Sequence, residues 1–252
     1  MKIRIFDDSL TMAKAAADHA VEIIQQALAD RGHAHVVAST GESQVDFLRE
    51  LSFHRDLDWA NVEVFPIGEF IGLPADHPAS MQRFLRDRLI TKTGIKRFVS
   101  FGDDASQARR IAEAGAKLRS APADIAFVTI GGNGQLGLNR PPADFEAQEL
   151  YGTVDLDLAF RQNQVNEGWF VDLGQVPMQA ISMSVSQIMK ATEILAVVPD
   201  AGMALAVKVC VEHGISPTAP ATILRTHPNA ALYLDRDSSA QLSLPENEAP
   251  KR

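Results

Sequence analysis

Apolar residues follow two alternating patterns along this chain, short continuous runs and longer stretches with helical spacing. A short run that is apolar throughout is typical of a buried strand, whereas apolar residues at every third or fourth position indicate a helix. The runs predict strands at residues 3–6, 34–39, 62–67, 98–101, 125–130, 180–185, 194–198 and 231–234. The helical spacing predicts one helix capped by Ser9 and ended by Gly32, and further helices at 43–51, 81–90, 105–118, 203–213 and 220–225.

The order of these elements predicts the fold class. Apolar strands that alternate with helices form a parallel sheet that is covered on both faces. We therefore expect an α/β fold, a doubly wound and mostly parallel sheet with helices on both faces, in a single domain of residues 1–235. The remaining residues, 236–252, are polar and are expected to form a flexible tail. Ligand sites in such folds lie beyond the carboxyl ends of the strands, here at 39–43, 67–77, 131–142 and 199–203.

Composition and charge narrow the classes of partner. Hydrophobic residues make up 46% of the chain and charged residues 22%, which is typical of a globular protein. The net charge of −8 argues against nucleic acid or an anionic membrane as a partner. A single cysteine, Cys210, excludes an intrachain disulfide and a cysteine-based zinc site. With no signal-peptide pattern at the N-terminus, we expect a cytoplasmic protein that needs no cofactor or metal.

The segment Ser39, Thr40, Gly41, Glu42 and Ser43 lies between a predicted strand and a predicted helix. Small hydroxyl residues and a glycine at the start of a helix can form an anion site, because free backbone amides point outward there. An ordinary turn between a strand and a helix has a similar sequence. The carboxylate of Glu42 would repel a phosphate unless it points away from these amides.

A glycine-rich segment that begins at Gly132 matches the pattern GxGxxG after a strand. Dinucleotide binding by this pattern requires a helix that starts at once, with its N-terminus facing the pyrophosphate. Two prolines, Pro141 and Pro142, follow instead, so no helix can start before Ala143. We therefore expect a loop that brings backbone close to some other ligand. The seven histidines form no metal-binding pair, and the chain contains neither a GxSxG elbow nor a P-loop lysine motif.

Several segments in a fixed order resemble the glucosamine-6-phosphate deaminase/isomerase family. They are Ser39-Thr40-Gly41, FPIGEFIGLP at 65–74, HPAS at 77–80, GGNGQLGLNRP at 131–141, QVNEGWF at 164–170 and LRTHPNA at 224–230. The resemblance runs from about residue 30 to residue 235. It implies a doubly wound α/β fold and the conversion of an amino-sugar 6-phosphate to a keto-sugar phosphate and ammonia. In that reaction a carboxylate moves a proton between C1 and C2, and a histidine oriented by carboxylates opens the sugar ring.

The chain departs from the family pattern at the positions that carry this chemistry. Gly68 stands where the family has the proton-moving aspartate, and Asn133 replaces the aspartate of the segment Asp-Gly-His. Gln135 replaces the ring-opening histidine, and Arg140 replaces the glutamate of the segment Asn-Glu-Pro. A glutamine side chain cannot exchange a proton near neutral pH, and glycine offers no base. Each general acid or base contributes typically ~10²–10⁴-fold, so the parental reaction should be lost or nearly so.

The phosphate end of the pattern has changed as well. Met203 stands at or near the position of a phosphate-binding lysine, and Glu42 replaces the second glycine of the phosphate loop. If Glu42 and Arg140 both point inward, the polarity of the pocket is reversed. An anionic group of the ligand would then lie near Arg140, with Arg161 as a second cation.

The combined substitutions favour a pseudoenzyme that keeps the fold and binds a small sugar-like or sugar-phosphate-like molecule. One alternative is an active isomerase or deaminase with altered catalytic groups, in which Glu69 or another residue supplies the base. A third interpretation is a true deaminase. The weakest is a nucleotide-binding oxidoreductase, because no helix can follow the GxGxxG segment directly. The sequence leaves open whether the chain forms a homo-oligomer. The residues expected to bind the ligand are Ser39, Thr40, Gly41, Glu42, Ser43, Glu69, Gly132, Asn133, Gln135, Arg140 and Arg161.

Overall fold

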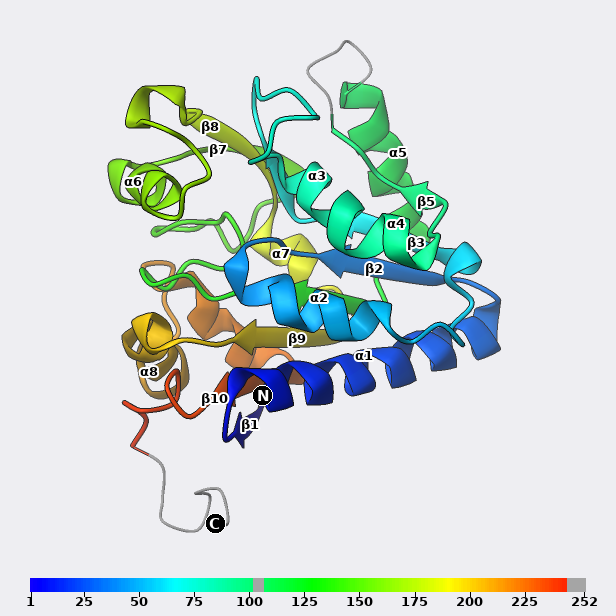
Figure 1. The fold of residues 1–252 in the computed structure, drawn as a ribbon, viewed down its shortest axis with the longest axis horizontal. Coiled ribbons are helices and arrows are strands. Elements are labelled where there is room, and N and C mark those ends of the chain that lie inside the picture. The colour runs from blue at the N-terminus through cyan, green and yellow to red at the C-terminus, as the bar shows by residue number, and fades with distance from the viewer. Residues whose placement is uncertain (102–106, 244–252) are drawn as a thin grey trace.

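A seven-stranded parallel sheet forms the centre of the molecule in the computed structural model, which describes residues 1–101 and 107–243 (Figure 1). All six neighbouring strand pairs are parallel, as the apolar runs predict. The strands, in their order across the sheet, are β1 Lys2–Phe6, β10 Ala230–Asp235, β9 Glu193–Val198, β6 Ile125–Val128, β2 Ala34–Ala38, β3 Val62–Pro66 and β5 Arg97–Phe98. The predicted doubly wound α/β fold class is confirmed.

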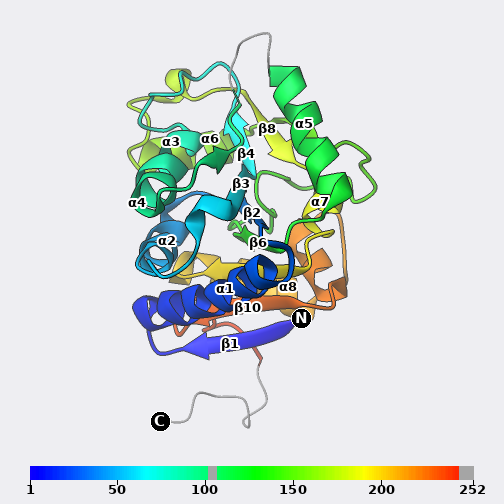
Figure 2. The same ribbon diagram turned by 90° about the vertical axis from the view of Figure 1, so that its right-hand side faces the viewer.

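Helices cover both faces of this sheet and enclose two separate cores (Figure 2). One face packs against α1 Ser9–Arg31, α2 Val45–Ser52 and α3 Met81–Leu85, after which the chain continues through a π-helical stretch, Arg86–Ile90, into α4 Thr91–Thr93. The other face packs against α5 Gln107–Ser120, α7 Val185–Ile188 and α8 Ala204–Glu212. The predicted start of the helix at 105–118 lies outside the described residues, which resume at Gln107.

The N-cap of the long helix α1 lies one residue earlier than the sequence predicts. Asp8, and not Ser9, is the N-cap: its carboxylate accepts a hydrogen bond from the backbone N–H of Thr11 at 2.8 Å. The positive end of the helix dipole also stabilises a carboxylate at this position. Gly32 ends the helix with φ of 72°, a left-handed conformation that glycine adopts without steric cost.

A second, three-stranded antiparallel sheet lies beside the carboxyl ends of the main strands and corrects one prediction. The run at 180–185 was expected in the main sheet, but it forms β8 Gln179–Met183 of this small sheet, between β4 Gly68–Phe70 and β7 Tyr151–Asp155. Four of the five residues of β8 are buried, so its apolar pattern resembles that of a parallel strand. Together with α6 Leu158–Asn166 the small sheet encloses a third core around Phe70 and Phe170.

The remaining short elements are 3-10 helices at Glu42–Gln44, Trp59–Asn61, Leu173–Gln175, Ala201–Met203 and Pro220–Thr226. After β10 the chain turns back toward α8, where Lys208 Nζ donates to the carbonyl of Gln241 at 3.0 Å and to Ser243 Oγ at 2.9 Å. The last residues of the predicted tail, 244–252, lie outside the described part. None of the described helices is long and apolar enough to cross a membrane.

Candidate functional site

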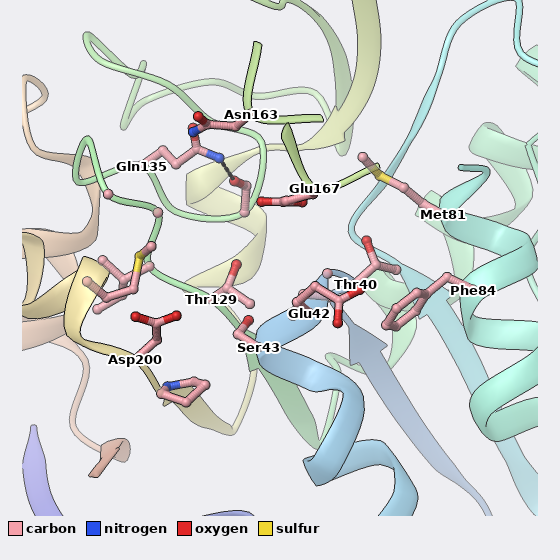
Figure 3. A pocket seen from close by; sticks show the side chains of 18 of the residues that line it. Thr40, Glu42, Ser43, Met81, Phe84, Thr129, Gln135, Asn163, Glu167 and Asp200 are labelled. Carbon is pink, nitrogen blue, oxygen red and sulfur yellow. Dashed lines mark hydrogen bonds between the residues drawn. The ribbon is translucent and has the colours of Figure 1, made fainter. Parts of the chain in front are cut away.

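A cleft of about 970 Å³ opens at the carboxyl ends of the central strands, where the sequence predicts a ligand site. Its walls come from the loops that follow β2, β3, β6 and β9, closed on one side by residues of α3 and on another by α6 and the turn after it (Figure 3). The four candidate segments 39–43, 67–77, 131–142 and 199–203 each contribute lining residues. The strand order therefore brings together segments that lie up to 164 residues apart, as Ser39 and Met203 do.

The loop after β2 enters the cleft with all five of its predicted residues. Ser39 still belongs to the sheet through its backbone N–H, which donates to the carbonyl of Phe127 at 3.1 Å. Gly41 has φ of 109°, which turns the chain into the 3-10 helix Glu42–Gln44. The Ser39 side chain is 96% buried, and its Oγ has no hydrogen-bond partner among residues 1–101 and 107–243. The loop thus presents one carboxylate, that of Glu42, and holds the unpartnered Ser39 hydroxyl beneath its surface.

The glycine-rich loop after β6 folds on itself through its two amide side chains. Asn133 Oδ1 accepts from the backbone N–H of Gln135 at 3.0 Å, and Gln135 Nε2 donates to the carbonyl of Gly137 at 2.7 Å. Gly137, with φ of 58°, lies so close to Ile67 that an added Cβ would come within 2.8 Å of its Cγ2. Gly132, Asn133 and Gln135 all line the cleft. The two amides are used to shape the loop, and no helix follows it, which argues against dinucleotide binding.

Gly68 opens β4 at the edge of the cleft and has no space beside its Cα. An added Cβ would lie 2.3 Å from the carbonyl oxygen of Ile181 and 2.7 Å from Leu138 Cδ1. The first of these atoms belongs to the backbone of β8, which pairs with β4 at Gly68 and Ser182. No side chain can occupy this position unless the two strands move apart.

Glu69, predicted to bind the ligand or to act as a base, lies outside the cleft lining and is 4% exposed. Its carboxylate accepts five hydrogen bonds, from the backbone N–H groups of Phe70, Met81 and Gln82 and from the side chains of Ser80 and Gln82. These bonds tie the start of α3 to β4. A carboxylate with this many donors is engaged within the protein, and the structure does not bring it to the cleft; a role of Glu69 in binding or catalysis stays a prediction.

The two arginines expected at the mouth of the cleft also point elsewhere. Arg140 forms an ion pair with Asp157 and lines a separate, smaller cleft of about 480 Å³. Arg161 donates to the carbonyls of Leu173 at 2.6 Å and Val176 at 3.2 Å. Neither arginine is among the residues that line the larger cleft. The structure therefore does not bring Arg140 to this cleft, and Asp157 neutralises its guanidinium; pairing of an anionic ligand group with Arg140 stays a prediction.

The larger cleft is acidic. Among the residues that the structure describes, its lining contains no lysine, arginine or histidine. It contains six carboxylates, those of Glu42, Asp46, Glu167, Asp200, Asp235 and Asp237. Figure 3 shows Glu42, Glu167 and Asp200 directed at the same hollow, with Ser43 and Thr129 between them. Any bound group therefore meets negative potential from several sides.

Glu167 is the carboxylate whose ionisation the cleft alters most clearly. Desolvation raises its pKa above the usual value, and the charge of Glu42 raises it further. A hydrogen bond from Trp169 Nε1, 3.1 Å long, opposes both effects and lowers the pKa. Glu167 is thus a cleft carboxylate that takes up a proton more readily than an ordinary glutamate.

Sequence reasoning did not single out Glu167 or Asp200 as site residues. Glu167 lies within the segment QVNEGWF, which carried the family resemblance, and Asp200 lies just beyond a predicted strand. Asp200 also has φ of 87°, unusual for a residue other than glycine, and its Oδ1 accepts from the backbone N–H of Gly202 at 2.7 Å. Its position after a strand was the available signal, since that edge of the sheet is where sites form.

Comparison with known proteins establishes the family. Residues 7–135 match the family of glucosamine-6-phosphate isomerases and 6-phosphogluconolactonases. Over 229 residues the chain is 30% identical to a glucosamine-6-phosphate deaminase of Streptococcus gordonii, an alignment that covers 90% of this chain and 94% of that protein. The chain belongs to the glucosamine-6-phosphate isomerase/6-phosphogluconolactonase family. A deaminase of Streptococcus pneumoniae serotype 4 is 28% identical over 224 residues, 88% of this chain and 94% of that protein.

Solved structures of glucosamine-6-phosphate isomerase/6-phosphogluconolactonase folds match the whole molecule. A monomeric glucosamine-6-phosphate deaminase superposes with a TM-score of 0.85 at 22% identity, covering 95% of this chain and 99% of that one. The 6-phosphogluconolactonase of Trypanosoma brucei superposes with a TM-score of 0.75 at 14% identity, covering 96% and 98%. Both superpositions cover at least 95% of this chain, so the likeness of fold includes the small antiparallel sheet as well as the central one.

Proposed function

We propose that this member of the family keeps the fold and the cleft, does not deaminate amino-sugar phosphates, and binds a small sugar-like ligand. Its place in carbohydrate metabolism follows from the family. The proposal also places the protein in the cytoplasm, in keeping with its one cysteine, Cys210, which is buried and unpaired.

The observation that carries this proposal is the closed position at Gly68. The family resemblance places the proton-moving aspartate there, and the backbone of β8 leaves no room for its side chain. A substitution that removed only the carboxylate would leave space behind it. At Gly68 the carbonyl oxygen of Ile181 and the side chain of Leu138 occupy that space, so the position has no room for a side chain.

The neighbouring positions support the same conclusion. The side chains of Asn133 and Gln135 are hydrogen-bonded to the backbone of the loop, through Asn133 Oδ1 and Gln135 Nε2. Neither amide can transfer a proton near neutral pH. Arg140, where the resemblance places a glutamate, faces Asp157 in another cleft. No histidine lines the larger cleft within the described part of the chain, so the ring-opening group of the family has no counterpart there.

One observation favours a second candidate, an active isomerase or deaminase with altered catalytic groups. Glu167 lines the cleft, and its raised pKa brings it nearer to the range in which a carboxyl exchanges protons at neutral pH. In this candidate Glu167 replaces the missing aspartate as the base.

Steady-state release of ammonia from glucosamine 6-phosphate distinguishes the two candidates. The proposal predicts no release above the level without protein. A turnover of about 1 s⁻¹ or more would contradict it, because typical enzymes fall at ~1–10³ s⁻¹. If such turnover is lost in Glu167→Gln but kept in Glu113→Gln, the second candidate is correct. Glu113 lies in α5 with 62% of its side chain exposed and does not line the cleft, so it matches the charge change elsewhere.

A further inference from the structure

The charge of the cleft is opposite to what a sugar phosphate requires. Phosphate sites in proteins combine backbone amides with lysine or arginine side chains. Here the described lining residues include six carboxylates and no cation, and Met203 stands at or near the family's lysine position. Glu42 lies in the loop that would hold the phosphate. A dianionic group would therefore enter a region of negative potential with nothing to neutralise it.

The carboxylates do not form a metal site. No three aspartate, glutamate, histidine or cysteine side chains of residues 1–101 and 107–243 lie close enough together to hold a metal ion. They are distributed around a cleft of about 970 Å³, which is large enough for a small organic molecule. An ammonium group on a small organic molecule can approach such separated carboxylates without a preformed set of three ligands.

Glu42 and Glu167 are the pair best placed to hold the positive group. They come from different elements, the 3-10 helix after β2 and the turn after α6, and both point into the hollow in Figure 3. The charge of Glu42 acts on Glu167 and raises its pKa, so the two carboxylates repel each other across the cleft. Trp169 fixes one of them, because its Nε1 donates to Glu167 Oε2 at 3.1 Å. A cation between the two carboxylates would relieve this repulsion.

Ser39 provides an independent sign of a missing polar partner. Its side chain is 96% buried at the end of β2, it lines the cleft, and its Oγ lacks a hydrogen-bond partner within the described chain. Buried hydroxyls are nearly always hydrogen-bonded. Because the Oγ itself has almost no accessible surface, a ligand hydroxyl or ammonium at this end of the cleft supplies the partner only when the surrounding groups shift slightly.

We propose that the ligand of the cleft is an unphosphorylated amino sugar, whose ammonium group lies between Glu42 and Glu167 and whose hydroxyls include the partner of Ser39. This inference rests on the proposed function, because it names the class of sugar that the cleft binds. It reverses the charge selection that the family resemblance implies. The amino group is retained as the feature that is recognised, and the phosphate is excluded.

Isothermal titration with four sugars tests both features separately. Glucose, glucosamine, glucose 6-phosphate and glucosamine 6-phosphate differ only in the amino and phosphate groups, and the titrations are run at a pH at which the amine is protonated. Glucosamine is expected to bind about three- to tenfold more tightly than glucose, the effect of one charge-assisted interaction in a solvated cleft. Each phosphorylated sugar is expected to bind more weakly than its parent sugar.

The variant Glu167→Gln tests whether Glu167 causes the tighter binding of glucosamine than of glucose. It should bring the affinity for glucosamine down toward that for glucose, while Glu113→Gln, an equal change of charge on α5, should keep the preference. Tighter binding of the phosphorylated sugars, equal binding of glucosamine and glucose, or an unchanged preference in Glu167→Gln would each overturn this inference and leave the sugar-binding proposal standing. Absence of binding by all four sugars would overturn both.

Discussion

Glu167, Glu42 and Trp169 show how a few side chains set the chemistry of the cleft. The carboxyl of Glu167 is partly desolvated, faces a like charge and accepts one hydrogen bond, and these three influences act on its pKa in different directions. The like charge and the hydrogen bond can each be removed by a single substitution. The pKa of Glu167 in such variants therefore tests the arrangement of these three side chains directly.

The substitution Glu42→Gln should lower the pKa of Glu167, because it removes the repelling charge. The substitution Trp169→Phe should raise that pKa, because it removes the hydrogen bond that favours the ionised form. Carboxyl carbon shifts of Glu167 measured by NMR across a pH titration report both changes. Shifts of the same sign in the two variants would show that the arrangement of these three residues is wrong.

The pH dependence of amine binding follows from the same raised pKa. Glu167 attracts a cation only when it is ionised, so affinity for glucosamine should fall as the pH is lowered through the pKa of Glu167, and should be regained above it. In Glu167→Gln the step should disappear from the titration curve. A step that persists in this variant would assign the effect to another group.

The contact at Gly68 makes a prediction about stability. The substitution Gly68→Ala should lower the free energy of unfolding by about 1–3 kcal/mol or more, because the new Cβ collides with the carbonyl of Ile181. Gly152→Ala is the matched control, since Gly152 lies in β7 of the same sheet with nothing within 4 Å of an added Cβ. The control should change stability by no more than about 0.5 kcal/mol. Urea unfolding measures both, and equal stability of the two variants would contradict the closed position.

At the scale of elements, Glu69 joins two parts of the site that sequence alone leaves unconnected. Its carboxylate holds the first turn of α3 against β4, and Ser80 caps the same helix through the backbone N–H of Arg83. Gln82, held by Glu69, also reaches the backbone of Phe101 in both directions, donating to its carbonyl and accepting from its N–H at 2.7 Å. The wall of the cleft formed by α3 thus depends on one buried carboxylate.

Removal of that carboxylate should be costly. Glu69→Ala removes the acceptor of five hydrogen bonds, three of them from backbone N–H groups, and is expected to destabilise the protein by about 3–5 kcal/mol. Asp87→Ala removes an exposed carboxylate from the following turn, where it pairs with Arg83, and should cost less than about 1 kcal/mol. Thermal and urea unfolding compare the two. A small effect at Glu69 would mean that it is free to act in the cleft after all.

At the scale of the whole molecule, the sequence predicted the main sheet well because its strands are buried on both faces and read as uninterrupted apolar runs. The small sheet was not predicted, because β7 has mostly exposed side chains and β8 has the apolar pattern of a parallel strand. Antiparallel pairing between Gly68–Phe70 and Gln179–Met183 joins segments about a hundred residues apart, which local periodicity cannot reveal.

The sequence predicted which loops line the cleft, but not which charged side chains point into it. Spacing and family resemblance located the segments around Ser39, Gly68 and Asn133, because strand ends of a parallel sheet meet at one edge. They could not show that Arg140 turns to Asp157, since a long charged side chain follows its nearest partner. Nor could they show that Glu42 and Glu167, 125 positions apart, act on each other.

Because the lining of the cleft is acidic, a cation introduced there should increase the affinity for a phosphorylated sugar. Met203→Lys should raise affinity for glucosamine 6-phosphate about three- to tenfold by placing an ammonium among the lining residues. Leu205→Lys adds the same charge on the outer side of α8, where Leu205 is 59% exposed and does not line the cleft, and should have little effect. Calorimetric titration of both variants decides this, and an equal gain in both would assign the effect to net charge alone.

The central claim is that no group in this cleft moves a proton between C1 and C2 of an amino-sugar phosphate. Proton NMR of glucosamine 6-phosphate and fructose 6-phosphate with ammonium in D₂O tests it most directly, because exchange at these carbons reports the proton transfer even when no product is released. Deuterium is expected to enter neither carbon faster than in the sample without protein. Exchange that scales with protein concentration and is lost in Glu167→Gln would contradict it and show that the cleft is catalytic.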